Sequence, residues 1–473
     1  MLRFYNSLGN KMEEFKPIKQ GFVGMYTCGP TIYNYAHIGN LKCYTWEDLL
    51  KRYLKYKGFE VKQVMNYTDI DDKTIKGSIL EKVSLYEFTE KYKLAFHEDL
   101  KTMNILPAEI YCPATEHIKE MVELIEKLLA KQVAYKGEDG SIYFSIKKFP
   151  EYGKLAGLDP KKLKAGARIK QDEYEKEGVG DFALWKSWDE NDGPVFWETR
   201  LGKGRPGWHI ECSAMSIKYL GEHFDIHTGG VDNKFPHHEN EIAQAEAATG
   251  KKFVNYWMHT AHLMVNGEKM SKSLGNFYDL RDLTKIGLKP MAIRYTFLNT
   301  NYRQQLNFTF DSVRDSQKTL EGIQNFIERL RLVESQPEKS TDIVDISEPI
   351  ANAKKGFESG MDNDLSVPEA MKHIFEFTKD INRLMDANRL GKEGATSALN
   401  FLKEINSVMG VLTFEEKFFE LTQDQQALVD ERIAAKKTKN WAKADEIRAK
   451  LKAQGIELVD NKDGTISAKA VQD

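Results

Sequence analysis

The chain has 473 residues, of which 41% are hydrophobic and 29% are charged, enough for several domains with cores of their own. No apolar run approaches the length of a membrane span, and the N-terminal segment lacks the apolar stretch of a secretory signal. We therefore expect a cytoplasmic protein with no membrane partner. The formal net charge of −3 gives no argument for nucleic-acid binding, so a basic surface has to be sought locally.

Strand and helix patterns alternate between residues 21 and 117. The apolar run Phe22–Tyr26 predicts a short buried strand, and Leu41–Lys57 predicts a helix with apolar residues at helical spacing. A second strand is predicted over Val61–Tyr67. Alternation of this kind is typical of βαβ units and a parallel sheet.

The pattern changes between residues 118 and 203, which we interpret as an insertion into the sheet domain. A long helix, two short strands and a polar loop region rich in Lys and Gly are predicted here, over Ile118–Lys131, Val133–Tyr135, Ile142–Ile146 and Leu155–Asp181. A strand at Asp225–His227 and a helix at His237–Ala248, with Gly250 as its stop, then return to the sheet domain.

Beyond residue 291 the sequence becomes helical, with strong patterns over Asp311–Val333, Ile350–Asn388 (interrupted near Asn363–Pro368) and Thr396–Met409. The tail from Thr422 is predicted to be a small unit of its own. Its segment 428–452 holds eight Lys/Arg against four Asp/Glu, the local basic surface that the net charge hides. An apolar stripe in this segment, which we expect to pack into the tail's core, is formed by Trp441, Ala444, Ile447 and Leu451.

The stretch from Cys28 to Asn40, CGPTIYNYAHIGN, joins the first predicted strand to the first helix. A strand, a Gly/Pro loop and a helix N-terminus form a natural phosphate site, because unpaired N–H groups and the helix dipole face the loop. The alternative is that His37 merely caps the helix. These residues alone leave both interpretations open.

Four residues make a plausible zinc set, although they are far apart in the sequence. The four cysteines, at 28, 43, 112 and 212, are too widely spaced to suggest a disulfide framework. Cys28 and Cys212 can be joined by His237 and Glu241, which lie one helical turn apart. By spacing alone the alternatives stay open; they are His238 and Glu239, and also His209, His223 and His227 nearby.

The loop Gly267–Asn276 contains the run EKMSKS at 268–273. Ammonium and hydroxyl groups in a Gly-flanked loop can hold a triphosphate, because they neutralise its oxygens and donate hydrogen bonds to them. The alternative is a solvated basic loop.

Together, HIGN at the start of a helix and KMSKS later in the chain resemble the paired signatures of class I aminoacyl-tRNA synthetases. The flanking segments YTCGPTIYNYAHIGN, GWHIECSAM, FPHHENEIAQ and NGEKMSKSLGN are similar to those of the cysteinyl-tRNA synthetase family. The resemblance covers nearly the whole chain, from FYNSLGN near the N-terminus to RIAAKKTKNWAKADEIRAKLKAQGIEL in the tail.

The resemblance implies an α/β fold, in which a Rossmann-like parallel-sheet catalytic domain with an insertion is followed by a helical bundle and a small α/β C-terminal domain. The expected boundaries are 1–117 and 204–255 for the two halves of the catalytic domain, 118–203 for the insertion, 256–310 for a stem-contact region with the KMSKS loop, 311–415 for the bundle and 416–473 for an anticodon-binding domain.

The resemblance also assigns roles to residues of this chain. It implies one Zn²⁺ per chain, with Cys28, Cys212, His237 and Glu241 as ligands. ATP, accompanied by Mg²⁺, would be bound by His37, Gly39, Asn40, Lys269 and Lys272, of which all but Gly39 are expected to be catalytic. The cysteine pocket would be lined by Thr68, Trp208 and Asp232.

Three departures from the family pattern leave details open. Asn40 replaces the last His of the HIGH signature, but its amide can still donate to a ribose or phosphate oxygen. Thr228 stands where some members have Gly, which affects the fine adenosine contacts. The tail has GTISAK where many relatives carry an aromatic residue and Arg.

The implied reaction activates L-cysteine with ATP and transfers it to tRNA(Cys), and we expect a monomer. The alternative is a cysteine ligase acting on a small amine, such as an aminosugar, which would share the zinc and nucleotide residues. The basic tail argues against this alternative, because an RNA can use it and a small amine cannot.

Overall fold

The computed structural model describes residues 1–158, 180–271, 274–337, 340, 342–414 and 421–460, and the backbone of the strands at 168–169 and 466–470. The predicted polar loop Leu155–Asp181 lies largely outside the described residues. The chain divides into two compact units, Met1–Leu412 and Thr413–Asp473, which are described separately below.

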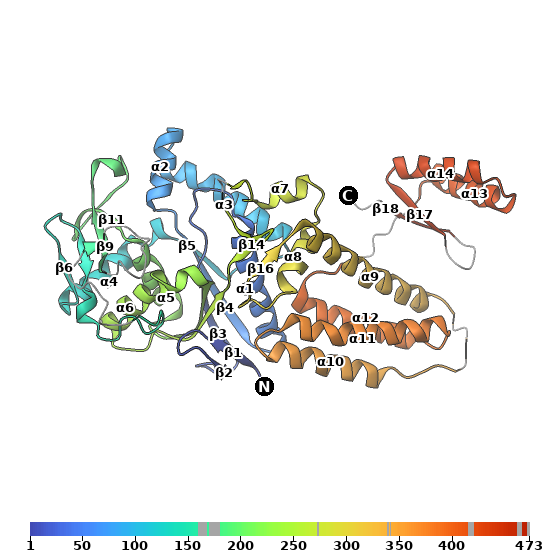
Figure 1. Cartoon of the computed structure of the whole chain (residues 1–473), viewed down its shortest axis with the longest axis horizontal. Helices are drawn as coiled ribbons and strands as arrows, with labels where there is room; N and C mark the ends of the chain where they lie inside the picture. The colour runs from blue at the N-terminus through green and yellow to red at the C-terminus, as the bar shows by residue number, and fades with distance from the viewer. Residues whose placement is uncertain are drawn as a thin grey trace. The chain divides into compact units, whose positions relative to one another are not determined.

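A five-stranded parallel sheet forms the centre of the first unit, as the alternating pattern predicts (Figure 1). Its order is β13-β12-β3-β4-β5, and the bounds are β3 Phe22–Thr27, β4 Glu60–Tyr67, β5 Ile110–Pro113, β12 Phe224–Gly230 and β13 Val254–Thr260. The chain moves outward from β3 to β5 and then returns to the other side of β3. Strand order therefore reverses between β3 and β12, which is where open α/β sheets bind their ligands.

Helices cover both faces of this sheet. One buried cluster joins Tyr26 and Val64 of the strands to helices α4, α5 and α6, and the other joins Met65 and Tyr67 to helices α1, α3 and α8. Successive strand residues point to opposite faces, so β4 contributes to both clusters. The helices are α1 Ile38–Tyr56, α2 Asp72–Glu81, α3 Leu85–Thr102, α4 Ile118–Ala130, α5 Trp208–Leu220, α6 His237–Thr249, α7 Leu280–Lys285 and α8 Pro290–Leu298.

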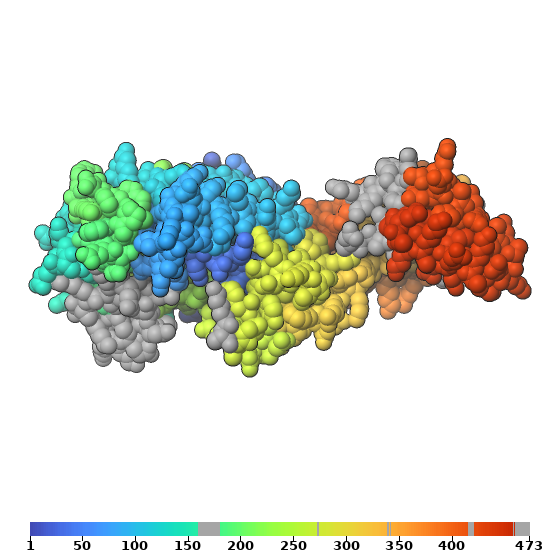
Figure 2. Space-filling view, turned by 90° about the horizontal axis from the view of Figure 1, so that it is seen from above, coloured from blue at the N-terminus to red at the C-terminus, as the bar shows by residue number. Residues whose placement is uncertain are grey.

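The insertion forms a mostly antiparallel sheet of its own, ordered β10-β11-β9-β7-β6, with β8 beside β9. Its strands are β6 Ala134–Lys136, β7 Ile142–Phe144, β8 Arg168–Ile169, β9 Asp181–Ser187, β10 Trp197–Thr199 and β11 Gly202–Pro206. Figure 2 shows the blue surface of α2 and α3 between this green insertion and the yellow segment that follows β13. Short 3₁₀ helices lie at Ala114–Glu116, Ile146–Lys148, Glu190–Asp192 and Val231–Lys234.

After β13 the chain forms a small sheet and then a helical bundle. The sheet consists of β14 Leu263–Val265, β15 Glu268–Lys269 and β16 Leu306–Phe308. The bundle consists of α9 Phe310–Ser335, α10 Ser347–Asp362, α11 Val367–Asp386 and α12 Lys392–Met409, in which α9 packs on α12 and α10 on α11. This confirms the predicted helical region. An N-terminal hairpin, β1 Arg3–Asn6 and β2 Lys11–Glu14, contacts β13.

The second unit is a small α/β arrangement, as predicted. Helices α13 Gln423–Lys437 and α14 Trp441–Ala453 are followed by the antiparallel pair β17 Ile456–Asp460 and β18 Ile466–Ala470. In the described part of the chain, no helix is long and apolar enough to cross a membrane.

The prediction that Trp441 packs into the core of the tail is wrong. Ala444, Ile447 and Leu451 of the stripe are buried, but Trp441 is 58% exposed. Helical side chains lean toward the helix N-terminus. At the first residue of α14 the indole therefore projects past the helix end rather than along the stripe.

A buried ionic cluster connects α1 to α8 and to the end of the bundle. Arg294 of α8 donates to Asp48 of α1 at 2.5 Å, and Arg52 donates to the same carboxylate oxygen at 2.7 Å. Arg294 also donates to the carbonyl oxygens of Met409 (3.0 Å) and Met103 (3.1 Å). Arg294 is fully buried, and it shares the Asp48 carboxylate with Arg52.

Replacing Arg294 with Met should destabilise the first unit by about 3–5 kcal/mol, because it leaves Asp48 short of a partner in a dry environment. Urea unfolding followed by tryptophan fluorescence measures this change. The control is Arg314→Ala, which removes the exposed ion pair with Asp311 and should leave the unfolding midpoint almost unchanged. Equal midpoints for both variants would contradict the argument.

Candidate active site

A cleft of about 450 Å³ opens at the carboxyl ends of β3 and β12, the position at which strand order reverses. Cys28 and Asp232, which follow β3 and β12, lie in its wall together with the first turns of α1 and α5. The loop before α7 lies along one side. Most of the predicted site residues line this cleft, namely Cys28, His37, Gly39, Asn40, Trp208, Cys212, Asp232, His237 and Lys269. Lys272 lies outside the described residues.

His37 does cap α1. Its Nδ1 accepts hydrogen bonds from the N–H groups of Gly39 (3.1 Å) and Asn40 (3.3 Å), and the Asn40 side-chain oxygen accepts from the His37 N–H (3.3 Å). A nitrogen that accepts two such bonds carries no proton, so in the neutral ring the N–H is at Nε2. Capping therefore fixes the ring by one nitrogen and assigns the other as a donor, and the two interpretations of the motif are compatible.

Gly39 is required by this cap. A Cβ added there would lie 2.9 Å from Nδ1 and Cε1 of the His37 ring and 3.1 Å from Cε of Met270. Any side chain at this position would displace the ring from the helix end. The room for adenine that the resemblance assigns to Gly39 stays a prediction.

The KMSKS segment, which we take as residues 269–278, contacts the start of α1 at its C-terminal end. The Ile38 N–H donates to the Tyr278 carbonyl oxygen (3.0 Å), and the ring of Phe277 meets that of His37 edge to face with centroids 5.1 Å apart. At the other end of the segment, Lys269 of β15 is exposed and lines the cleft. The two signatures that are distant in sequence are therefore adjacent in space.

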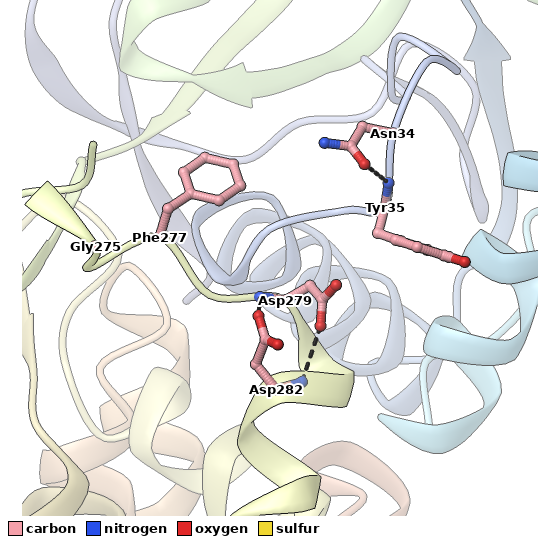
Figure 3. Close-up of a pocket in the computed structure, with 6 residues that line it drawn as sticks. All are labelled: Asn34, Tyr35, Gly275, Phe277, Asp279 and Asp282. Carbon is pink, nitrogen blue, oxygen red and sulfur yellow. Dashed lines mark hydrogen bonds between the residues drawn. The ribbon is translucent and has the colours of Figure 1, made fainter. Parts of the chain in front are cut away.

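A smaller pocket lies beside the cleft (Figure 3) and is lined by Asn34, Tyr35, Gly275, Phe277, Asp279 and Asp282. Asp279 caps α7 by accepting from the Asp282 N–H at 2.9 Å, and Asp282 accepts from the Asp279 N–H at 3.2 Å. The pocket thus lies between the loop that precedes α1 and the turn that leads into α7.

The four predicted metal ligands converge on one buried point. The ligand atoms of Cys28, Cys212, His237 and Glu241 all lie within 4.8 Å of one another. Nε2 of His237 is 3.1 Å from Oε1 of Glu241 and 3.4 Å from Sγ of Cys212. Oε1 of Glu241 is buried and has no hydrogen-bond partner among the described residues. Because buried polar atoms rarely lack a partner, this donor set fits a bound cation such as zinc.

A second set overlaps with the first. Cys28, His227, His238 and Glu241 also have ligand atoms within 4.8 Å of one another. The distances alone therefore do not choose between His237 and His238, and the choice of His237 stays a prediction supported by the family pattern.

Burial controls the protonation of the cluster. It raises the pKa of Cys28 and of Cys212 above that of a free thiol. It lowers the pKa of His237, His209 and His259 to about 3, and it also lowers the pKa of His238 well below that of a free imidazole. Each of these four imidazoles is neutral near pH 7. A divalent cation reverses the balance for the thiols, because it favours the thiolate.

The three predicted pocket residues lie in different places. Trp208 stacks on the imidazole of His237 with centroids 4.1 Å apart, and Asp232 lines the cleft at the end of β12. Thr68 is 1% exposed and donates to Glu211 at 2.9 Å, so it lies behind the residues that line the cleft. The substrate roles of all three stay predictions.

Thr228 has a structural role. Its hydroxyl donates to Oε1 of Glu47 on α1 at 2.7 Å, and burial raises the pKa of Glu47 to about 8. Glycine at this position would remove that partner. Sequence reasoning missed Glu47, because a Glu among apolar helix residues gives no sign that it is buried. It also missed Lys73 and His262, which line the cleft but belong to no recognised motif.

Comparisons with known proteins agree with this geometry. A sequence model of the family described as "tRNA synthetases class I (C) catalytic domain" matches residues 14–318, and one described as "DALR domain" matches residues 356–413. Proteins named "Cysteine--tRNA ligase" are similar over nearly their whole length. The one from Brachyspira hyodysenteriae is 50% identical (98% of this chain, 98% of the relative), and the one from Protochlamydia amoebophila is 48% identical (98% and 97%).

Solved structures share the fold at low sequence identity. The Mycobacterium tuberculosis methionyl-tRNA synthetase in complex with methionyl-adenylate has a TM-score of 0.61 at 13% identity, covering 82% of this chain and 90% of that one. A putative arginyl-tRNA synthetase from Campylobacter jejuni has a TM-score of 0.57 at 12% identity, covering 84% and 95%.

The parallel sheet with its cleft, the capped HIGN helix and the KMSKS segment define the catalytic domain of a class I aminoacyl-tRNA synthetase. Within this class, the two relatives reported above, which match nearly end to end, are both named "Cysteine--tRNA ligase". The chain belongs to the cysteine–tRNA ligase family.

The two roles of His37 can be separated by substitution. His37→Asn should leave stability within about 0.5 kcal/mol of the parent, because Asn is among the best N-cap residues. It should slow adenylate formation about 100-fold or more, because the Nε2 donor is lost. His37→Ala should lose the cap as well, at about 1 kcal/mol. Urea unfolding and ATP–pyrophosphate exchange measure the two effects, and full activity in His37→Asn would show that the residue is only a cap.

Proposed function

We propose that this chain is a cysteine–tRNA ligase that converts L-cysteine and ATP to cysteinyl-adenylate and pyrophosphate and then transfers cysteine to the terminal adenosine of tRNA(Cys). One observation supports this proposal above the others. The capped HIGN helix, the KMSKS segment and a buried Cys/His/Glu cluster, which are far apart in sequence, all border one cleft.

The first step needs no protein nucleophile. A carboxylate oxygen of cysteine attacks the α-phosphorus of ATP, and the bond to the bridging oxygen of pyrophosphate breaks. Catalysis then consists of positioning and of neutralising charge on the leaving group. The Nε2–H of His37 and the ammonium groups of Lys269 and Lys272 supply donors for this purpose, together with Mg²⁺ that accompanies ATP. In the second step a ribose hydroxyl of the tRNA attacks the carbonyl carbon, and AMP leaves.

Cys28, Cys212, His237 and Glu241 would hold the zinc ion. When bound, zinc would supply a coordination position that favours a thiolate over the hard, neutral hydroxyl of serine. A purely apolar pocket separates such near-isosteres by only about 100-fold. Trp208, stacked on His237, covers one side of the cluster and helps to exclude water from it.

The tRNA is proposed as the acceptor rather than a small amine. The end-to-end similarity to proteins named cysteine–tRNA ligase favours it. So does the second unit, where Lys437, Lys439, Lys443, Arg448, Lys450 and Lys452 are exposed. We propose that this unit binds the anticodon region, and that the enzyme acts as a monomer.

Purified protein should contain about one zinc per chain and should catalyse cysteine-dependent ATP–pyrophosphate exchange without tRNA. It should then transfer cysteine to tRNA(Cys) and not to an aminosugar. Cys212→Ser should weaken cysteine binding far more than ATP binding. An active preparation without zinc, or transfer to the aminosugar alone, would contradict the proposal.

Truncation after Leu412 should leave ATP–pyrophosphate exchange nearly intact, because the cleft lies in the first unit. Affinity for tRNA should fall and its salt dependence should become shallower, because fewer phosphates are neutralised. Trp441→Ala should leave folding unchanged, since the ring is exposed, and weaken tRNA binding about tenfold if a base stacks on it. Trp441→Phe is the matched control. A truncated chain with full affinity and an unchanged salt slope would show that the basic unit does not bind tRNA.

A further inference from the structure

Three histidines outside the predicted ligand set each contact one member of it. Nε2 of His238 is 3.2 Å from Sγ of Cys28, Nε2 of His227 is 2.9 Å from Oε2 of Glu241, and Nδ1 of His209 is 3.0 Å from Nδ1 of His237. All three are at most 1% exposed. We propose that His209, His227 and His238 form an outer layer that orients the metal ligands and fixes the position of their protons. This inference rests on the proposed function, because it takes Cys28, Cys212, His237 and Glu241 as the ligands.

At Glu241 the two carboxylate oxygens face opposite ways. Oε1 faces His237 at 3.1 Å, and Oε2 faces His227 at 2.9 Å. The other nitrogen of His227, Nδ1, has a longer contact of 3.3 Å with the Thr228 carbonyl oxygen. A hydrogen bond to an ionised carboxylate is the stronger one, so the Nε2–H of His227 donates to Oε2. This leaves Oε1 directed at the metal position.

At Cys28 a relay of hydrogen bonds follows from a single condition. A metal-bound thiolate can only accept, so His238 must donate from Nε2 and accept at Nδ1. Nδ1 of His238 is 2.8 Å from Nε2 of His259, and Nδ1 of His259 is 2.8 Å from the Ser7 hydroxyl. Ser7 therefore donates to His259, His259 donates to His238, and His238 donates to Cys28. Each neutral ring carries one proton, as this order requires.

At His237 the support is an acceptor. Nε2 of His237 faces Cys212 and Glu241, so its N–H is at Nδ1, and Nδ1 of His209 must accept it. The proton of His209 is then at Nε2. That atom is buried and has no hydrogen-bond partner in the described part of the chain. Leaving this N–H unpaired costs free energy. Because Nε2 makes no hydrogen bond to a described residue, the bond from His237 to Nδ1 is what orients the His209 ring.

The outer layer would offset the excess negative charge of the metal site. Two thiolates and one carboxylate carry three negative charges against the two positive charges of zinc. The surplus lies in a buried site, where charge is poorly solvated. N–H donors from His227 and His238 to two of the three anions offset it. They thereby preserve the capacity of the site to accept a further thiolate, that of the substrate.

The rival interpretation makes His227 and His238 metal ligands themselves, as members of the second set with Cys28 and Glu241. Amide substitutions discriminate between the two, because an amide replaces a hydrogen-bonding nitrogen but is a poor zinc ligand. The Gln side chain places its amide near the position of the histidine Nε2, and the Asn side chain near that of Nδ1.

The experiment measures zinc affinity of the full-length chain by chelator competition with ZnCl₂. The variants His227→Gln and His238→Gln should have a zinc affinity within about threefold of the parent. The variants His227→Asn and His238→Asn should bind zinc about 10–100-fold more weakly. At position 209 the order should reverse: His209→Asn should retain the zinc affinity of the parent, and His209→Gln should lose it. The control is His117, a buried histidine bonded to Pro113 and Tyr219, where neither amide should change zinc affinity.

Substitution with Co²⁺ gives a second readout, since a tetrahedral site with thiolates has a characteristic absorption spectrum. The spectrum should be retained in His227→Gln and His238→Gln. If both lose zinc and the Co²⁺ spectrum as fully as Cys212→Ser, the two residues are ligands and the inference is wrong. Equal affinities for Gln and Asn at all three positions would also overturn it, while leaving zinc binding and the proposed function intact. A parent protein that binds no zinc would overturn the metal assignment itself. Should one position give unfolded variants, the other two decide.

Discussion

Helix α1 is buried on nearly every side, and this constraint organises the first unit. Its buried residues include Lys42, Glu47, Asp48, Lys51 and Arg52 as well as its apolar stripe. Each of these polar side chains must find a partner without water. Lys42 donates to the Ala261 carbonyl oxygen at the end of β13 (2.7 Å), and Lys51 donates to the Pro107 carbonyl oxygen before β5 (2.6 Å). The helix that presents His37 is therefore tied to both edges of the sheet and, through Asp48, to the bundle.

This arrangement explains why the catalytic signatures are held so differently. The HIGN motif belongs to a helix that cannot shift without breaking buried polar contacts. The described part of the KMSKS segment is held by the pairing of β15 with β14, by the backbone bond from Ile38 to Tyr278 and by the partly buried side chain of Met270. A fixed histidine opposite a segment that carries the exposed Lys269 suits a reaction in which the leaving group must be stabilised and then released.

Much of the fold could be predicted from the sequence, because continuous apolar runs mark strands that are covered on both faces, and an apolar stripe marks each bundle helix. The strands β3 and β4, the helix α6 with its stop at Gly250, and the bundle helices were predicted within a few residues. Polar residues of α1 gave no sign of burial, since a sequence does not show what packs on a helix from outside. Trp441 was misplaced because periodicity locates a face but not the end of a helix.

The candidate site could be predicted in part for related reasons. His237 and Glu241 share a helix, so their proximity follows from spacing alone. Their proximity to Cys28 depends on the order of strands in the sheet, which the sequence does not show directly. The choice between His237 and His238 depends on the rotation of α6 about its axis. In the structure His237 faces Cys212, and its neighbour His238 faces Cys28.

The ligand cluster spans the boundary at which strand order reverses. Cys28 follows β3 in the first half of the catalytic domain, whereas Cys212, His237 and Glu241 come after the insertion. During synthesis the first half, including the capped start of α1, leaves the ribosome well before the second. A cation held by all four side chains can be captured only once the chain has been made through α6. If the cluster holds the metal proposed above, loading would be a late event of biogenesis, because it requires both halves of the sheet to be in place.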